Sequence, residues 1–211
     1  MINLFKLKAA ICLLGLSNSM QAQSFIKNDK IIEAGVGLAI YDTEIYQKST
    51  SNREKSKAAA WVFPVSFEYA VANRLAIGIG YKHSSYIRGN EDTTNANATI
   101  RGNDIILKPT FHIIKSKRIN MYVGALAGIS FFNFQVNDID QAYAKGDGTI
   151  LAFVFGTRFY FSKNIALSLN YTFNNYNFVD LTLANNKGYS DKLDLSLKRG
   201  NVGLGLVFKF N

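Results

Sequence analysis

The sequence predicts an all-β fold, an eight-stranded antiparallel up-and-down transmembrane β-barrel. Three observations predict it. Apolar residues alternate with small or polar residues in eight segments, each segment is long enough to cross a bilayer as a tilted strand, and long and short connections take turns along the chain. The clearest segment, residues 156–173, reads GTRFYFSKNIALSLNYTF and keeps a period of two on both sides of a Ser-Lys-Asn turn. It is predicted to be a membrane hairpin.

The remaining segments repeat this pattern. Besides the two arms of that hairpin, the expected strands are residues 31–41, 59–71, 75–86, 100–114, 119–132 and 197–210. Long connections are expected at 42–57, 88–99, 133–147 and 181–195, and short turns at 72–74, 115–118 and 162–164. An even number of strands places both chain ends on the side of the short turns, which is the arrangement of outer-membrane barrels. The expected location is therefore the cell outer membrane, with both termini in the periplasm.

The beginning of the chain predicts export. Lys6 and Lys8 precede an apolar run at 9–16 that is too short to span a membrane, so residues 1–22 are expected to be a signal peptide. Residues 23–30 would be a short periplasmic lead-in and 31–211 the barrel. The single cysteine, Cys12, falls within the leader, so the mature chain is expected to have neither disulfides nor thiolate metal sites. Without the leader, 22 basic residues face 15 acidic ones.

Side-chain volume decides which face of each strand is outside. Eight strands enclose an interior only just wide enough for side chains. The bulky residues of all eight segments would overfill it, whereas glycine, alanine and a few long polar chains would not. The bulky faces are therefore expected to contact lipid. Because an unpaired strand edge in hydrocarbon is costly, the first strand is expected to pair with the last.

These features carry a resemblance. The signal peptide, the hairpin FYFSKNIALSLNY and the final strand VGLGLVFKF together resemble the small outer-membrane β-barrel family of Gram-negative bacteria that includes OmpA/OmpX-type and porin-like proteins. The resemblance implies that the barrel-assembly machinery reads the last strand as its signal, through Phe208 and Phe210. In this chain Asn211 follows the terminal aromatic residue.

The predicted interior face carries isolated charges, which are the main site candidates. They are Glu33, Glu68, Lys82, Lys108, Arg158 and Lys209. Charges in a narrow lumen of low dielectric constant either pair with one another or set ion selectivity. A structural network inside a closed plug is the favoured interpretation, since eight-stranded barrels seldom leave an aqueous channel. A gate in a narrow porin for ions or small solutes is the alternative.

A second alternative is enzymatic. His83 and Ser85 share a strand face near the expected rim, and the H-x-S pattern is similar to that of outer-membrane lipid A deacylases. The nearby acids are Glu91 and Asp92, in an expected loop. Polar residues at the end of a strand are the favoured interpretation. His112 has no second histidine or cysteine at ligand spacing, so no metal site and no cofactor are predicted.

The predicted function is therefore non-enzymatic: an outer-membrane barrel with a structural or surface-interaction role through its four extracellular loops. The expected partners are outer-membrane lipid and lipopolysaccharide, the assembly machinery during insertion, and a larger outer-membrane complex. In the first long loop Lys48, Arg53, Lys55 and Lys57 outnumber the acids, which favours lipopolysaccharide phosphates as a partner; a simply solvated loop is the alternative. Nucleic-acid binding is not expected, because the positive charge forms no stripe, and a soluble lipocalin-like carrier is the most distant alternative.

Overall fold

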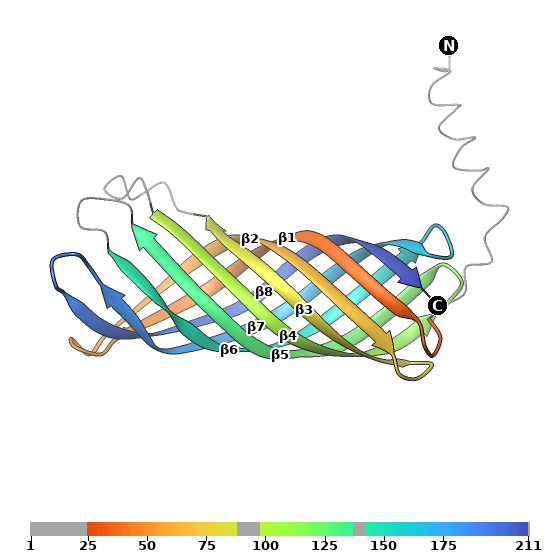
Figure 1. Cartoon of the computed structure of the whole chain (residues 1–211), viewed down its shortest axis with the longest axis horizontal. Coiled ribbons are helices and arrows are strands. Elements are labelled where there is room, and N and C mark those ends of the chain that lie inside the picture. The colour runs from red at the N-terminus through yellow and green to blue at the C-terminus, as the bar shows by residue number, and fades with distance from the viewer. Residues whose placement is uncertain (1–24, 88–97, 137–141, 211) are drawn as a thin grey trace, which may run out of the picture.

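The computed structural model describes residues 25–87, 98–136 and 142–210, and these form one closed barrel of eight antiparallel strands (Figure 1). The strands are β1 Lys30–Gln47, β2 Asn52–Ala70, β3 Leu75–Ile87, β4 Ala98–Lys115, β5 Ile119–Val136, β6 Tyr143–Tyr160, β7 Ile165–Ala184 and β8 Ser190–Phe210. Within these ranges no helix is long and apolar enough to cross a membrane. The predicted signal peptide lies outside the described residues.

The barrel closes between its first and last strands, as predicted. β1 pairs with β2 on one side and with β8 on the other, in a register that runs from Lys30 opposite Phe210 to Gln47 opposite Leu193. Closure leaves no strand edge, so the ladder can pair the backbone groups that face lipid. The C-terminal end of β8 and the three short turns lie at one end, here called the turn end; the opposite end is the loop end (Figure 1).

Three of the four predicted long loops are wrong in extent. Residues 42–57 were expected to form a loop, but β1 continues to Gln47 and β2 begins at Asn52. Likewise most of 181–195 belongs to β7 and β8, and most of 133–147 to β5 and β6. The reason is that the strands continue beyond the apolar part of the barrel, where polar residues suit a strand whose outer face meets water. The fourth prediction, 88–99, does connect two strands, and most of it lies outside the described residues.

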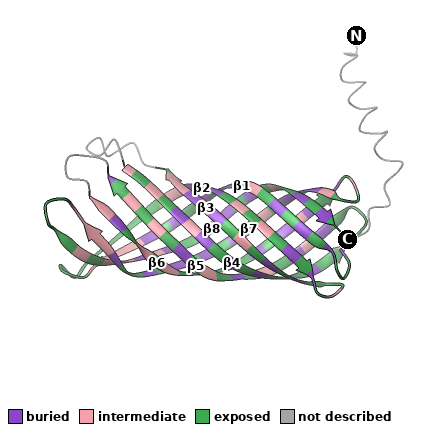
Figure 2. Cartoon of the chain, in the orientation of Figure 1, coloured by how far each residue is buried: buried purple, intermediate pink, exposed green. Residues whose placement is uncertain are grey.

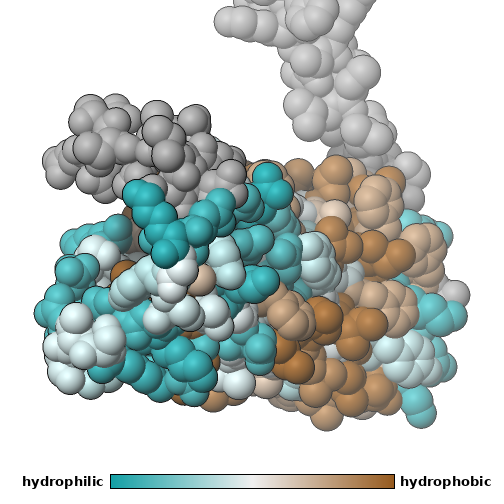
Figure 3. All heavy atoms as spheres, turned by 60° about the vertical axis from the view of Figure 1, so that its left-hand side comes forward, coloured by the Kyte–Doolittle hydropathy of each residue, from teal (hydrophilic) through white to brown (hydrophobic). Residues whose placement is uncertain are grey.

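The outer surface carries an apolar belt toward the turn end. Figure 2 shows buried and exposed residues alternating along the strands, and Figure 3 shows hydrophobic side chains gathered in one band with a hydrophilic surface on the loop-end side. Belt side chains come from all eight strands and include Leu38, Phe63, Ile79, Leu107, Ile129, Phe153, Phe173 and Leu204, each between 43% and 71% exposed. This is the surface that hydrocarbon tails would cover, and it confirms the predicted transmembrane architecture.

Toward the loop end the polarity of the wall reverses. In β8 the outward residues Val202, Leu204 and Leu206 are apolar, whereas nearer the loop end the inward residues Leu195 and Leu197 are apolar and buried. β5 changes in the same way between Phe131, which is exposed, and Phe132, which packs against the buried core. The loop half thus has an apolar interior and a polar exterior.

The lead-in is part of the turn-end core rather than an exposed tail. Phe25 is fully buried and its ring stacks on His112 with centroids 3.6 Å apart. The backbone N–H of Asn28 donates to the Ala70 carbonyl at 2.8 Å, and this hydrogen bond joins the lead-in to the end of β2. The lead-in therefore fills the turn end of the lumen.

Candidate functional site

The centre of the candidate site is an ionic layer, defined by Glu33, Glu68, Lys108 and Arg158 from β1, β2, β4 and β6. Arg158 Nη2 lies 2.8 Å from Glu33 Oε2 and 2.6 Å from Glu68 Oε1. Lys108 Nζ lies 2.8 Å from Glu68 Oε1. The period of two places all four side chains inside the barrel, and Arg158 and Glu68 have no exposed surface. Two carboxylates against two cations make the layer electrically balanced.

Neighbouring polar groups hold the layer in place. Ser168 and Asn170 of β7 donate to Glu33 Oε1 at 2.7 and 2.5 Å. The Arg158 guanidinium lies over the ring of Tyr122, with its carbon 4.4 Å from the ring centroid. Removing one partner from such a cluster would leave a buried charge without compensation, which is strongly destabilising. The layer is therefore a structural unit that crosses the lumen.

A second ion pair lies nearer the loop end. Lys82 Nζ is 3.1 Å from Asp104 Oδ2 and also donates to the Tyr176 hydroxyl at 2.5 Å. Asp104 accepts further hydrogen bonds from Tyr176 at 2.8 Å and from Ser130 at 2.5 Å. Each carboxylate oxygen of this buried acid therefore has a partner. This pair is also balanced.

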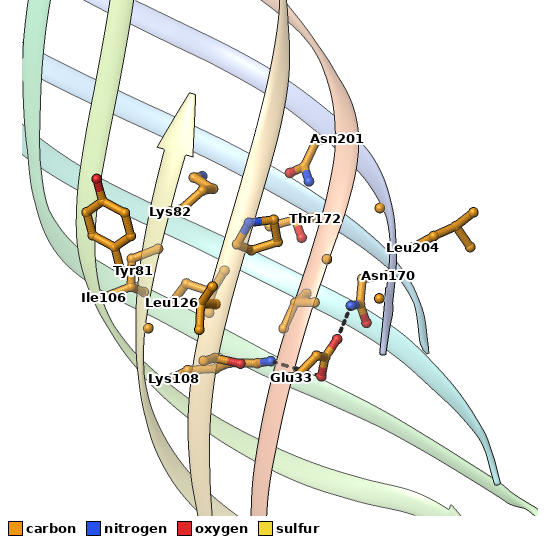
Figure 4. Close-up of a pocket in the computed structure, with 18 residues that line it drawn as sticks. Glu33, Tyr81, Lys82, Ile106, Lys108, Leu126, Asn170, Thr172, Asn201 and Leu204 are labelled. Atoms are coloured by element: carbon orange, nitrogen blue, oxygen red, sulfur yellow. Dashed lines mark hydrogen bonds and ion pairs between the residues drawn. The ribbon is translucent and has the colours of Figure 1, made fainter. Parts of the chain in front are cut away.

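Between the two ionic groups lies a small cavity of about 80 Å³ (Figure 4). Lys108 and Glu33 line one side of it, and Lys82 and Asn201 line the other. Charged, polar and apolar residues all line it, and its volume is sufficient for a few water molecules. Two nitrogens of the neighbouring ionic layer, Arg158 Nε and Nη1, are buried without a hydrogen-bond partner among the described residues.

The sequence placed all six predicted lumen charges on the inner face, and the structure divides them into three groups. Glu33, Glu68, Lys108 and Arg158 meet in the ionic layer, while Lys82 and Lys209 do not reach it. Lys82 pairs with Asp104, and Lys209 Nζ lies 3.6 Å from Asp29 Oδ2 at the turn end. The six predicted residues alone carry an excess of two positive charges, which Asp104 and Asp29 balance.

Those two acids are the site residues that sequence reasoning missed. Asp104 could have been found, because it shares the inward face of β4 with Lys108 at a spacing of four residues. Asp29 had no such signal, since it lies in the lead-in before β1, and only its 1% exposure in the folded chain reveals it.

The enzymatic alternative gains no support from the geometry. His83 Nδ1 lies 2.8 Å from the side-chain oxygen of Asn103, which also accepts a hydrogen bond from the Tyr81 hydroxyl at 2.6 Å. An amide thus occupies the place where a catalytic base would need an orienting carboxylate. The candidate acids Glu91 and Asp92 lie outside the described residues.

No group of three metal-ligating side chains occurs within residues 25–87, 98–136 and 142–210. His112 is fully buried at the turn end, where its Nδ1 lies 2.7 Å from the side-chain oxygen of Asn120. With Phe25 stacked on its ring, this histidine packs in the interior.

At the loop end, polar contacts join the β1–β2 turn to the β7–β8 hairpin in what we call the loop clasp. Lys48 Nζ lies 2.5 Å from Asp180 Oδ1 and 3.3 Å from Asp194 Oδ1. Gln47 and Ser49 donate to Asp191 at 2.9 and 2.5 Å. The hydrogen bond from Ser49, then that from Gln47, lowers the pKa of Asp191 from 3.8 to about 2. The clasp joins β1 and β8 beyond the belt.

A closed barrel with an apolar belt and buried, charge-balanced ion pairs in its lumen defines a small transmembrane β-barrel protein. Residues 10–210 match the family model for the outer membrane protein beta-barrel domain, and the chain belongs to this family. This confirms the resemblance seen in the sequence and identifies an outer-membrane barrel.

Solved structures share the fold at low sequence identity. OprG from Pseudomonas aeruginosa is 14% identical, with 92% of this chain and 100% of OprG covered and a TM-score of 0.63. The Neisserial surface protein A, NspA, is 11% identical, with 86% and 97% covered and a TM-score of 0.55. The outer membrane protein AlkL is 13% identical, with 89% and 92% covered and a TM-score of 0.53. No curated protein matches the chain.

Proposed function

We propose that this protein is a non-conducting, non-enzymatic outer-membrane barrel that acts through its loop end. In this proposal both termini lie in the periplasm and the loop end faces outward from the cell. The observation that carries it is the ionic layer, in which Arg158 and Glu68 are fully buried in the middle of the lumen. Ions cannot pass such a layer unless its buried pairs separate, and that is strongly unfavourable.

Planar bilayer recording tests the proposal against the narrow porin. The purified full chain is expected to give no single-channel steps, while Arg158→Ala, which removes the largest buried side chain of the layer, is expected to give intermittent current. Arg101→Ala, on the exposed outer face of β4, is the matched control and should be silent like the wild type. Steady wild-type current that Arg158→Ala alters would support the porin and overturn the proposal.

The proposed partner at the outer surface is phosphorylated lipid, with lipopolysaccharide as the expected source. Lys55, Lys57 and Lys198 are exposed just beyond the belt and form no ion pair among the described residues. They neighbour Asp42 and Glu44, which pair with Arg199 and Arg53 at 3.0 and 2.9 Å. The cationic surplus lies where lipid phosphates would meet the barrel, so it favours their binding.

Native mass spectrometry with lipid A tests this partner. The double variant Lys55→Gln/Lys57→Gln is expected to retain less lipid A than the wild type. The control Lys117→Gln/Lys163→Gln removes two exposed cations at the turn end and should retain as much as the wild type. Equal retention by both variants, or equal retention of dephosphorylated lipid A by the wild type, would contradict the proposed contact.

Assembly adds a further proposed partner. Phe208 and Phe210 point outward near the turn end of β8 and are 41% and 48% exposed. Their exposure leaves them accessible to the barrel-assembly machinery during insertion. That the protein belongs to a larger outer-membrane complex remains a prediction.

A further inference from the structure

The loop half of the lumen contains a second cavity, larger than the central one and without the buried charges that line the central one. It has a volume of about 480 Å³, within the range of about 300–1,000 Å³ that small-molecule sites occupy. We call it the apolar cup and define it by its large apolar lining residues Ile45, Tyr86, Ile87, Ile100, Phe132, Phe134, Leu183, Leu193, Leu195 and Leu197. These residues come from six strands, β1, β3, β4, β5, β7 and β8.

The cup has a floor of aromatic rings. Tyr86 lies 5.9 Å from Tyr41 and 6.1 Å from Phe132, measured between ring centroids. Phe132 in turn lies 5.6 Å from Phe178, and Tyr176 stacks on Phe178 at 6.1 Å. Beneath Tyr176 comes the buried pair of Lys82 and Asp104. The cup is therefore closed toward the turn end, and the geometry suits holding a molecule rather than passing one through.

The chemistry of the lining restricts the occupant. The polar members of the wall, Thr43 and Ser56, hydrogen-bond to each other at 2.5 Å, so each hydroxyl already has a hydrogen-bond partner. Lys57 is the only charged residue among those lining the cup, and it is exposed and lies opposite the outward-facing Asp42 in the ladder. A charged ligand would be desolvated here without a buried partner, which is costly. An uncharged apolar ligand would instead remove leucine, isoleucine and phenylalanine surface from water.

We propose that the apolar cup is a binding site for a small uncharged alkyl-chain molecule, held against the leucine row of β8 and the phenylalanines of β5. Leu195 and Leu197 supply the most buried part of the wall, at 5% and 2% exposure, and Leu193 is half-buried nearer the mouth. The site is separate from the ionic layer, and its apolar wall, unlike Lys57 at its edge, takes no part in the proposed lipid contact, so the inference does not depend on the proposed function.

Photolabelling tests the site. The full chain in lipid nanodiscs is irradiated with an uncharged dodecyl diazirine, and the labelled residues are mapped by mass spectrometry, with and without excess dodecane. Label is expected at inward positions of the cup, such as Phe134 and Leu195, in addition to the lipid-facing belt. Excess dodecane should remove the cup label.

Two variants address the cup in different ways. Leu193→Glu places a charge at the mouth, and Ala58→Trp fills part of the space; both are expected to lose the cup label and keep the belt label. Asn177→Glu adds the same charge on the exposed outer face of β7 and should label like the wild type. Heat-dependent migration in gels checks that each variant is folded. Label confined to the belt in the wild type, or cup label that neither dodecane nor the two variants remove, would overturn the proposal.

Discussion

The belt half and the loop half of this barrel use the same eight strands with opposite chemistry. In the belt half, apolar side chains face outward and the interior holds ions, such as Arg158 with Glu33 and Glu68. In the loop half, the interior holds Leu195 and Leu197 and the outer face carries charges such as Lys198. One half is built for lipid outside, and the other resembles a water-exposed barrel with an apolar core.

The difference shows what determines polarity along a continuous strand. The barrel is closed and its strands are paired in both halves, so strand pairing alone does not decide which face is apolar. What changes is the medium outside, and with it the side-chain face that must be apolar. Within the described strands three register irregularities occur, between His112 and Ile114, between Lys145 and Gly148, and between Phe178 and Leu181. The last two lie in the loop half.

The largest expected effect comes from breaking the ionic layer. Arg158→Met leaves Glu33 and Glu68 with Lys108 as their only cation in the layer, so the free energy of unfolding should fall by about 3–5 kcal/mol. Urea titration in lipid vesicles, followed by tryptophan fluorescence, measures it. The exposed control Arg101→Met should stay within about 0.5 kcal/mol of the wild type. Equal effects of the two substitutions would mean that the layer contributes nothing to stability.

The interior of the loop half should respond to loss of volume. Leu197→Ala removes a fully buried side chain from an apolar core and should cost about 2–5 kcal/mol in the same titration. Lys198→Ala, its exposed neighbour, should cost little. If Leu197→Ala were as mild as the control, the loop half would not be packed as a core.

The two outer faces can be compared on one strand. Leu169 and Asn177 both face outward on β7, the first in the belt and the second beyond it. Leu169→Lys should lower the free energy of unfolding by about 2–4 kcal/mol, because the ammonium group would enter hydrocarbon. Asn177→Lys should change it by less than about 0.5 kcal/mol. A similar cost at both positions would remove the distinction between the halves.

Much of this organisation was predictable from the sequence, and the part that was missed has a physical cause. Period-two alternation found all eight strands and placed Glu68, Lys108 and Arg158 in the lumen. It stopped at the edge of the belt, because there the apolar residues change from one face to the other, as between Leu197 and Val202 in β8. If apolar residues are expected at the outward positions along the whole strand, the strand residues beyond the belt resemble a polar loop.

The pairing of the charges was less predictable. Which cation meets which acid depends on the stagger between strands that are distant in sequence, such as β2 and β6 for Glu68 and Arg158. The burial of the lead-in was missed for another reason. Phe25, which stacks on His112, belongs to no segment with alternating apolar residues, so nothing in the sequence pattern indicates that it is buried.

The smallest expected effect concerns the loop clasp. Hydrogen bonds from Ser49 and Gln47 hold the pKa of Asp191 at about 2, below the ordinary 3.8, so its carboxylate favours the folded clasp above that ordinary value. The contribution should be lost as the pH falls through about 2. Amide hydrogen exchange at Lys48, compared between pH 5 and the acid range, measures it. Asp191→Asn should remove the pH dependence, and an unchanged acid transition in that variant would contradict the assignment.

The central claim is that the same eight strands pass from lipid into water, and that their outward side chains change there from apolar to polar while their inward side chains change from polar to apolar. Spin labels at outward cysteines replacing Leu167, Leu169, Phe173, Asn175 and Asn177 of β7 test it most directly, by their collision rates with oxygen and with a water-soluble nickel complex. The account predicts oxygen-dominated collisions at the first three positions and nickel-dominated collisions at the last two. Equal accessibility to nickel at Leu169 and Asn177 would contradict it.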